Sequence, residues 1–199
     1  MRKITDKEIV LATHNKGKIS EFSLMMKPFG LGVISASDLD LPEPEETGKT
    51  FEENAILKAK AGALASGKVV LADDSGLSVN AIDGKPGIYS ARWAGEQKDF
   101  DMAMSKVNEE LGNNADRRAA FIAVIAVAWP DGQVETFEGR VEGEIVWPPR
   151  GNGGFGYDPI FQPAKEERTF GQMSPEEKKS MSHRGNAFKK MIDSLFNND

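Results

Sequence analysis

The spacing of apolar residues along the chain predicts alternating strands and helices. Apolar runs rich in branched residues at 8–12, 32–35 and 69–72 are too short for helices and are typical of buried strands. Residues 77–80 alternate between apolar and polar, as a strand with one buried face does. The almost wholly apolar run 119–129 predicts a central strand.

Helical spacing and capping residues predict the helices. The first helix is expected to begin at about Gly17 and to be closed by Pro28 and Gly30. The sequence Thr50-Phe51-Glu52-Glu53 fits a capping box, which starts an alanine-rich helix that ends near Gly67. Residues 98–111 are expected to be helical. A second capping box, Ser174-Pro175-Glu176-Glu177, starts helical segments that continue to about Phe196.

Turn residues complete the predicted fold. Pro130-Asp131-Gly132 favours a hairpin turn, and a return strand follows from Gln133 to about Val146. Prolines and glycines exclude regular structure at 41–50 and 147–159. A β-α-β-α-β opening followed by a long hairpin predicts an α/β fold with a mixed, twisted central sheet flanked by helices. The length of 199 residues suits one domain, with or without a small lobe.

Composition narrows the class of protein. The chain has 25 basic and 31 acidic residues, and this net charge of −6 argues against broad nucleic-acid binding. The absence of cysteine excludes disulfides, thiol catalysis and thiolate-bound zinc. No run approaches the ~18 apolar residues of a membrane span, and the start of the chain lacks a signal-peptide pattern. We therefore expect a cytoplasmic protein with no membrane and no nucleic-acid partner.

The junction of the first strand and first helix is a candidate anion site. The loop reads Thr13-His14-Asn15-Lys16-Gly17-Lys18. Amides at a helix N-terminus, the helix dipole and two lysines favour phosphate oxygens. The loop is not a Walker A motif, because the leading glycine is missing and Ile19 replaces the magnesium-binding hydroxyl residue. The alternative is a polar turn with solvated lysines.

A pair of carboxylates is the candidate metal and proton-transfer site. Asp73 and Asp74 are expected at the end of the strand 69–72 and are followed by Ser75-Gly76. Such a pair suits an oxygen-seeking cation, and one member can take a proton from a metal-bound water. The alternative is a turn, in which Asp, Ser and Gly are preferred. His14 and His183 are the only histidines, so a metal held by oxygens, Mg²⁺ or Mn²⁺, is favoured.

Two further segments could meet a nucleobase and the rest of a nucleotide. Gly151 to Pro159 formally contains G-x-G-x-x-G, but no helix follows, so we reject a dinucleotide site. Its aromatic rings and carboxylate suit a base, or else the rings are core residues. The segment 178–185 holds a His-Arg pair at an expected helix junction, where side chains can be aimed inward.

Together these segments resemble one enzyme family over residues 8 to 196. The motifs occur in a fixed order: Val10-Leu11-Ala12-Thr13-x-Asn15-x-x-Lys18, Glu45-Glu46-Thr47-Gly48, Ala72-Asp73-Asp74-Ser75-Gly76-Leu77, Pro86-Gly87-Ile88-Tyr89-Ser90-Ala91-Arg92, Gly153-Gly154-Phe155-Gly156-Tyr157-Asp158-Pro159 and Ser182-His183-Arg184-Gly185. The chain resembles the non-canonical purine nucleoside triphosphate pyrophosphatases, the inosine/xanthosine triphosphatase family. One departure is His14, where bacterial members commonly carry glycine and where a side chain is expected to crowd the phosphate loop.

The resemblance implies an activity and a fold. The family hydrolyses ITP, dITP and XTP to the monophosphate and pyrophosphate with Mg²⁺, which removes deaminated purines from the nucleotide pool. Its members are usually homodimers, with two lobes and a nucleotide cleft between them. Discrimination against adenine is expected from a donor, His183 or Arg184, that faces the 6-oxo group.

The resemblance also implies roles for individual residues. Asp74 is expected to be the general base, and Glu45 and Asp74 the magnesium ligands. Lys58 is expected on the exposed side of the alanine-rich helix as a phosphate contact, and Phe155 is expected to stack on the base. The complete set of implied substrate-binding residues is Thr13, His14, Asn15, Lys16, Gly17, Lys18, Lys58, Ser75, Phe155, Gly156, Tyr157, Asp158, Lys178, His183 and Arg184.

Two alternatives differ in function. One is a related nucleotide pyrophosphatase of Maf type, which acts on other modified nucleotides. The other is a catalytically silent nucleotide-binding module. The intact set of Asp74, Glu45 and Lys18 disfavours the silent module, because a sensor has no need of a base beside the metal.

Overall fold

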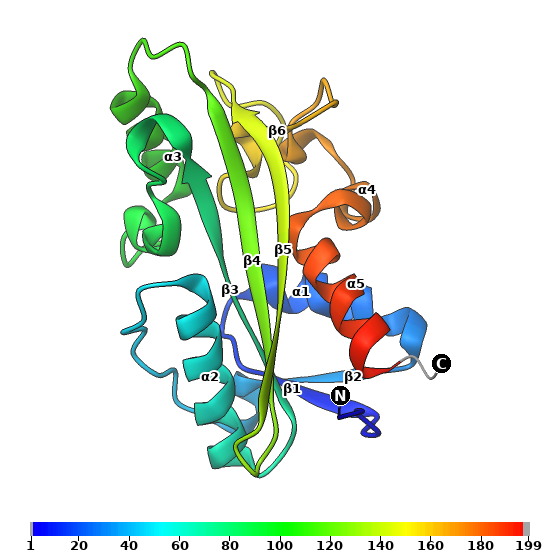
Figure 1. The fold of residues 1–199 in the computed structure, drawn as a ribbon. Helices are drawn as coiled ribbons and strands as arrows, with labels where there is room; N and C mark the ends of the chain where they lie inside the picture. The colour runs from blue at the N-terminus through cyan, green and yellow to red at the C-terminus, as the bar shows by residue number, and fades with distance from the viewer. Residues whose placement is uncertain (1, 197–199) are drawn as a thin grey trace. The chain divides into compact units, whose positions relative to one another are not determined.

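The computed structural model describes residues 2–196 and shows an α/β fold with one mixed sheet (Figure 1). The sheet order is β2-β1-β3-β4-β5-β6, with β1 parallel to β2 and β3, and β5 antiparallel to β6. The strands are β1 (Glu8–Leu11), β2 (Gly32–Ser35), β3 (Val70–Val79), β4 (Arg118–Ala128), β5 (Val134–Ile145) and β6 (Phe161–Pro163). The helices are α1 (Lys16–Met26), α2 (Phe51–Ser66), α3 (Phe100–Leu111), α4 (Pro175–Met181) and α5 (His183–Leu195). The predicted fold class is confirmed.

The chain divides into two compact units. Unit 1 contains the residues up to Asp74, the segment Ala123–Gly139 and the residues from Arg184 onward. Unit 2 contains Ser75–Ile122 and Arg140–His183. Strands β3, β4 and β5 therefore contribute residues to both units. That the chain forms a single domain stays a prediction.

In unit 1, alternate residues of the strands face two different helical layers. Ile9, Leu11 and Leu71 belong to a core with side chains of α1 and α5. Val10 and Val70, which lie between them along the strands, belong to a second core with the alanines of α2. Because successive side chains of a strand point to opposite faces, α1 and α5 cover one face of the unit 1 strands and α2 covers the other (Figure 1).

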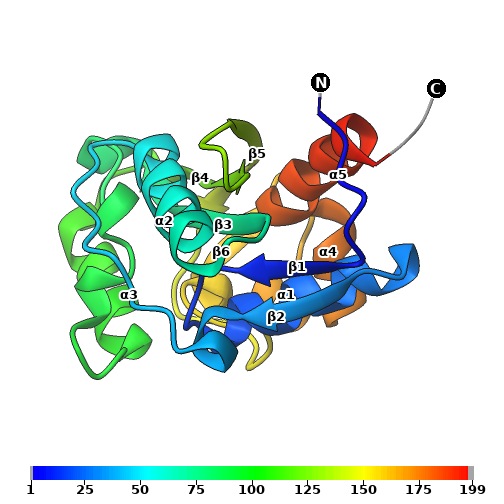
Figure 2. The same ribbon diagram turned by 90° about the horizontal axis from the view of Figure 1, so that it is seen from below.

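The start of the chain lies beside the end of α5 (Figure 2). The Ile4 amide donates to the Leu195 carbonyl at 3.1 Å, and Lys3 Nζ donates to the Ser194 carbonyl at 3.1 Å. Ile4 is buried in the same core as α1 and α5. These contacts tie the two ends of unit 1 together.

Unit 2 has its own apolar core. Leu77 and Val79 of β3 pack with Phe121 of β4, with Val107 of α3, and with Phe161 of β6. Residues 147–157 are irregular, as predicted, but the last two residues of the predicted irregular segment belong to a short 3₁₀ turn, Asp158–Ile160. The predicted capping box at Ser174 is formed at the start of α4.

Two local predictions need correction. The sequence predicts a strand that ends at Ala72 and a second strand at 77–80, whereas the structure has one continuous strand, β3, through Asp73 and Asp74. Carboxylates can occupy this buried strand because cationic side chains pair with both of them, as described below. At α2, Thr50 Oγ1 accepts from the Glu53 amide, but the Glu53 carboxylate accepts from the Lys49 amide and not from that of Thr50.

Candidate functional site

Asp73 and Asp74 face opposite sides of the sheet. They are neighbours in β3, so the alternation of the strand directs Asp73 toward α1 and α5 and Asp74 toward α2. Asp73 contacts Lys18 of α1 and Arg184 of α5, whereas Asp74 contacts Lys58 of α2. The predicted acidic pair is thus divided between two separate charge clusters.

The Asp73 cluster balances two cations against two carboxylates. Lys18 Nζ lies 2.7 Å from Asp73 Oδ2. Arg184 donates from Nε and Nη2 to the two Asp73 oxygens at 3.3 and 3.2 Å, and its Nη1 donates to Glu21. Burial alone would raise the pKa of Asp73, but Arg184 and Lys18 hold that pKa well below its usual range. Burial lowers the pKa of Lys18, and Asp73 opposes that shift.

The Asp74 cluster holds two carboxylates and one ammonium. Lys58 Nζ lies 3.0 Å from Asp74 Oδ1 and 2.6 Å from Glu46 Oε1. Burial raises the pKa of Asp74 above its ordinary value, and the nearby Lys58 ammonium opposes that shift without cancelling it. Burial alone would lower the pKa of Lys58, but the two carboxylates raise it. When all three groups are ionised this cluster carries an excess of one negative charge.

The position of Lys58 corrects the sequence analysis, and the metal-ligand role expected for Glu45 stays a prediction. Lys58 is buried and not on the exposed side of α2. Glu45, the expected metal ligand, is exposed, and its neighbour Glu46 makes the contact with Lys58. Asn54, one helical turn before Lys58, also reaches Asp74. The i, i+4 spacing of Asn54 and Lys58 is the signal that places both on one helix face.

The loop before α1 has fewer free amides than its sequence predicts. The Asn15 side chain accepts from the amides of Gly17 and Lys18 at 2.9 and 3.2 Å. Thr13 Oγ1 accepts from the Asn15 amide at 3.2 Å. Because Asn15 caps the helix in this way, two of the amides expected to meet an anion are already bonded.

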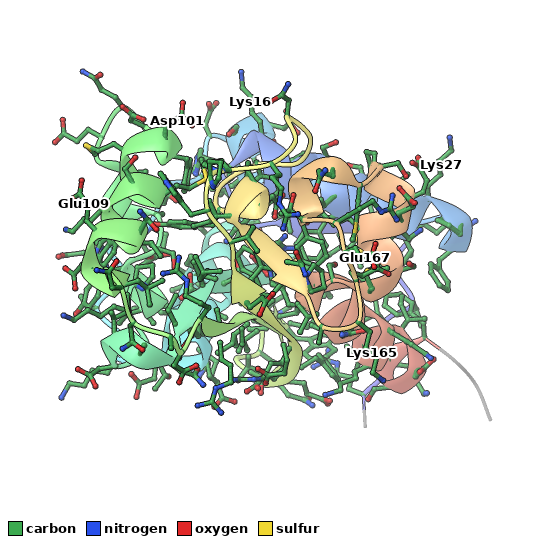
Figure 3. All side chains as sticks on the ribbon, turned by 90° about the horizontal axis from the view of Figure 1, so that it is seen from above. Lys16, Lys27, Asp101, Glu109, Lys165 and Glu167 are labelled. Carbon is green, nitrogen blue, oxygen red and sulfur yellow. The ribbon has the colours of Figure 1, made fainter. Side chains whose placement is uncertain are left out.

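The three basic or imidazole side chains of the loop lie in different surroundings. Lys18 is committed to Asp73, whereas Lys16 is exposed and its side chain projects from the start of α1 (Figure 3). His14 Nδ1 lies 3.6 Å from Glu43 Oε2. Within residues 2–196, no carboxylate lies within ion-pair distance of Lys16.

Most residues expected around the base lie in unit 2, whereas Arg184, one of the two donors expected to face the 6-oxo group, belongs to unit 1. Asp158 Oδ2 accepts from Lys178 Nζ at 2.7 Å and from the Phe155 amide at 2.8 Å. Lys178 Nζ also lies 4.5 Å from the Phe155 ring centroid, a cation–π contact. A Cβ at Gly154 would lie 2.0 Å from Asp158 Oδ2, and the φ of Gly154 is +71°, so this turn requires glycine.

Other residues of this set are more deeply placed. Tyr157 is a buried core residue whose hydroxyl donates to the Ser90 carbonyl at 2.8 Å, and burial raises the pKa of that phenol. His183 is buried, and its ring stacks on Phe121 with a centroid distance of 4.8 Å. Ser75 and Gly156 are half-buried. The inward orientation predicted for His183 and Arg184 at the helix junction is confirmed, since both are buried.

The fold and these clusters define an α/β protein that holds buried carboxylates against lysine and arginine. The family model described as "Ham1 family" matches residues 9–194. The chain belongs to the Ham1 family, and the family expected from the sequence is thereby confirmed.

Named relatives agree with this assignment. A protein named dITP/XTP pyrophosphatase from Gluconobacter oxydans is 55% identical over 188 residues, which cover 94% of this chain and 90% of that protein. One of the same name from Agrobacterium fabrum is 51% identical and covers 97% of this chain and 98% of its own length. The solved Staphylococcus aureus Ham1 protein has a TM-score of 0.84 and 47% identity over 94% of this chain and 97% of its own.

Proposed function

We propose that this protein hydrolyses the triphosphates of deaminated purine nucleosides, XTP, ITP and dITP, to the monophosphate and pyrophosphate. Relatives named dITP/XTP pyrophosphatase share about half of its residues over nearly the whole chain. The observation that carries the proposal is the Asp74 cluster, in which two carboxylates share one lysine. That excess of negative charge suits a divalent cation, which a polyphosphate substrate also needs.

We assign Asp74 and Glu46 as the residues that would hold Mg²⁺. Their oxygens are the ligand type that this cation prefers, and Mg²⁺ is commonly bound through one or two carboxylates and substrate phosphates. Among residues 2–196 there is no group of three or more His, Cys, Asp or Glu side chains that could hold a metal. When bound, the ion supplies charge neutralisation of the phosphates and a lower pKa of bound water.

Asp74 is the group that would take the proton of the attacking water. Burial raises the pKa of its carboxyl, and a higher pKa makes a carboxylate a better proton acceptor. Lys58 lies 3.0 Å from Oδ1 and keeps the carboxylate oriented. Attack at the α-phosphorus breaks the bond to the β-phosphate, so pyrophosphate leaves.

The base is assigned to unit 2. Phe155 is only half-buried, so its ring can stack on a purine. Tyr157 is buried in the core of unit 2 and is not assigned a stacking role. Arg184 is committed to Asp73 and Glu21, so of the two donors proposed for the 6-oxo group His183 is favoured. A donor aimed at that oxygen would be left unmatched by adenine, and such a mismatch gives strong discrimination.

A substrate panel tests the proposal. The protein is incubated with Mg²⁺ and ITP, XTP, dITP, dTTP, ATP or GTP, and pyrophosphate and orthophosphate are both measured. We expect pyrophosphate from ITP, dITP and XTP and far slower reaction of ATP and GTP. A preference for dTTP would favour a Maf-type activity, and binding without turnover would favour a nucleotide sensor.

A homodimer and a cytoplasmic location are also proposed. Light scattering tests the first of these.

Lys16 is expected to attract the triphosphate. Replacing Lys16 with glutamine should raise KM for XTP roughly five-fold and leave kcat unchanged. A unit charge at 4 Å in water is worth about 1 kcal/mol, and that energy corresponds to this change in affinity. The effect should fade in high salt, because ions screen exposed charges.

Lys27 provides the matched control. It is an exposed lysine directly after the last residue of α1 (Figure 3), so Lys27→Gln removes the same charge at the opposite end of that helix. We expect its KM to equal that of the wild type. Equal KM values for the two variants would show that Lys16 does not meet the substrate.

A further inference from the structure

Asn54 links the loop that carries Glu46 to Asp74. It is fully buried in α2. Its Oδ1 accepts from the Gly48 amide at 2.8 Å, and its Nδ2 donates to Asp74 Oδ2 at 3.3 Å. The Gly48 amide needs an acceptor, which fixes the orientation of the carboxamide and aims its N–H group at Asp74.

Gly48 is shaped for this contact. A Cβ at Gly48 would lie 2.6 Å from Asn54 Oδ1, a distance that real Cβ atoms essentially never show. The φ of Gly48 is outside the left-handed region, so its backbone alone does not require glycine. The requirement for glycine therefore comes from the close approach of this loop to α2, where Asn54 and Glu53 lie.

Two side chains of α2 together fix both carboxylates. Lys58 donates to Asp74 Oδ1 and to Glu46, and Asn54, one helical turn earlier, donates to Asp74 Oδ2. Gly48 is two residues beyond Glu46, so its bond to Asn54 restrains the same loop. Each oxygen of Asp74 thus has one donor from a single helix face.

We propose that Asn54 is a positioning residue that sets the spacing and orientation of the Asp74 and Glu46 carboxylates for a divalent cation. The inference rests on the metal ligands assigned in the proposed function. Mg²⁺ demands nearly ideal octahedral geometry, so the direction of each ligand matters. Partners that orient metal ligands typically affect metal affinity or activity by about 10–100-fold when they are replaced.

The test measures metal binding in the absence of nucleotide. Mn²⁺ is titrated into the wild type and into Asn54→Ala, and the free ion is followed by its electron paramagnetic resonance signal. We expect Asn54→Ala to weaken Mn²⁺ binding by about 10–100-fold. Gly48→Ala, whose Cβ would press on the Asn54 carboxamide and on the start of α2 at Glu53, should weaken binding in the same direction. Asn113→Ala changes an exposed turn asparagine and should bind as the wild type does.

Urea unfolding of the same variants separates positioning from a purely structural role. A structural role would move the unfolding midpoint and leave the Mn²⁺ affinity of the folded protein unchanged, and that result would overturn the inference. If Asn54→Ala does not fold, Gly48→Ala decides the question. A wild type that binds no Mn²⁺ would overturn both this inference and the metal assignment. If the wild type binds Mn²⁺ but hydrolyses no nucleotide, the proposed hydrolysis activity is refuted. The comparison of Mn²⁺ affinity between wild type and variants still tests the role of Asn54.

Discussion

Asp74→Asn is expected to lower the rate of pyrophosphate release from XTP by about 10²–10⁴-fold, the usual contribution of a general base. Asparagine has nearly the same shape as aspartate but cannot accept the proton, and its amide is a poorer ligand for Mg²⁺. The Asp74 carboxylate makes polar contacts with Lys58 and Asn54, which both belong to unit 1. Release of pyrophosphate under saturating XTP is the measurement, with folding checked by circular dichroism.

Asp101→Asn is the control for this prediction. Asp101 is exposed in the first turn of α3 (Figure 3), so the change removes one carboxylate charge far from β3 along the chain. Its rate should equal that of the wild type. Full activity of Asp74→Asn would remove Asp74 from the mechanism.

Asp73→Asn is expected to act on stability instead, lowering the free energy of unfolding by about 3–5 kcal/mol. Asp73 is fully buried and pairs with both Lys18 and Arg184, so neutralising it leaves the buried Arg184 and the partly buried Lys18 with one fewer partner. Removing one member of a buried ion pair is strongly destabilising because the remaining charge cannot return to water. Urea denaturation at neutral pH measures the change.

The matched control is an exposed pair of the same kind. Arg118 Nη2 lies 2.7 Å from Asp116 Oδ2, and Arg118 is well exposed to solvent. Asp116→Asn should change the free energy of unfolding by about 1 kcal/mol or less, because exposed pairs contribute little. If Asp73→Asn changed stability no more than Asp116→Asn, the buried network would not be a source of stability.

The expected contrast between two adjacent aspartates follows from the strand that carries them. The sequence places both carboxylates at the end of one strand, where they would bind the same cation. In the structure β3 continues through them, so one side chain faces α1 and α5 and the other faces α2. Their different partners are the reason for their different predicted roles.

Local signals were sufficient for most of the fold. The helix start expected near Gly17, the glycine after Ser66 and the proline at the start of α4 lie within a few residues of the helix ends in the structure. These signals work because capping depends on contacts between residues three or four positions apart. The strand 119–129 was likewise evident from its apolar run.

The candidate site was predicted less completely. The order of its motifs was enough to recognise the family, and the resemblance named Glu45 as a metal ligand. That Glu46 and not Glu45 contacts Lys58 came only from the structure. Lys58 was expected in solvent because lysine is rarely buried, yet two carboxylates on separate segments bring it inside. Asn54 gave no chemical signal by itself.

The amino-acid order by itself determined most of the helices and strands and their order along the chain, excluded thiol chemistry and identified the family. Only the tertiary structure decided which cation meets which carboxylate, since those partners lie 12 to 163 positions apart along the chain. Burial strengthens such pairings and makes each unmatched charge unfavourable. The excess negative charge of the Asp74 cluster therefore arises from the folded structure and cannot be predicted from a local sequence pattern.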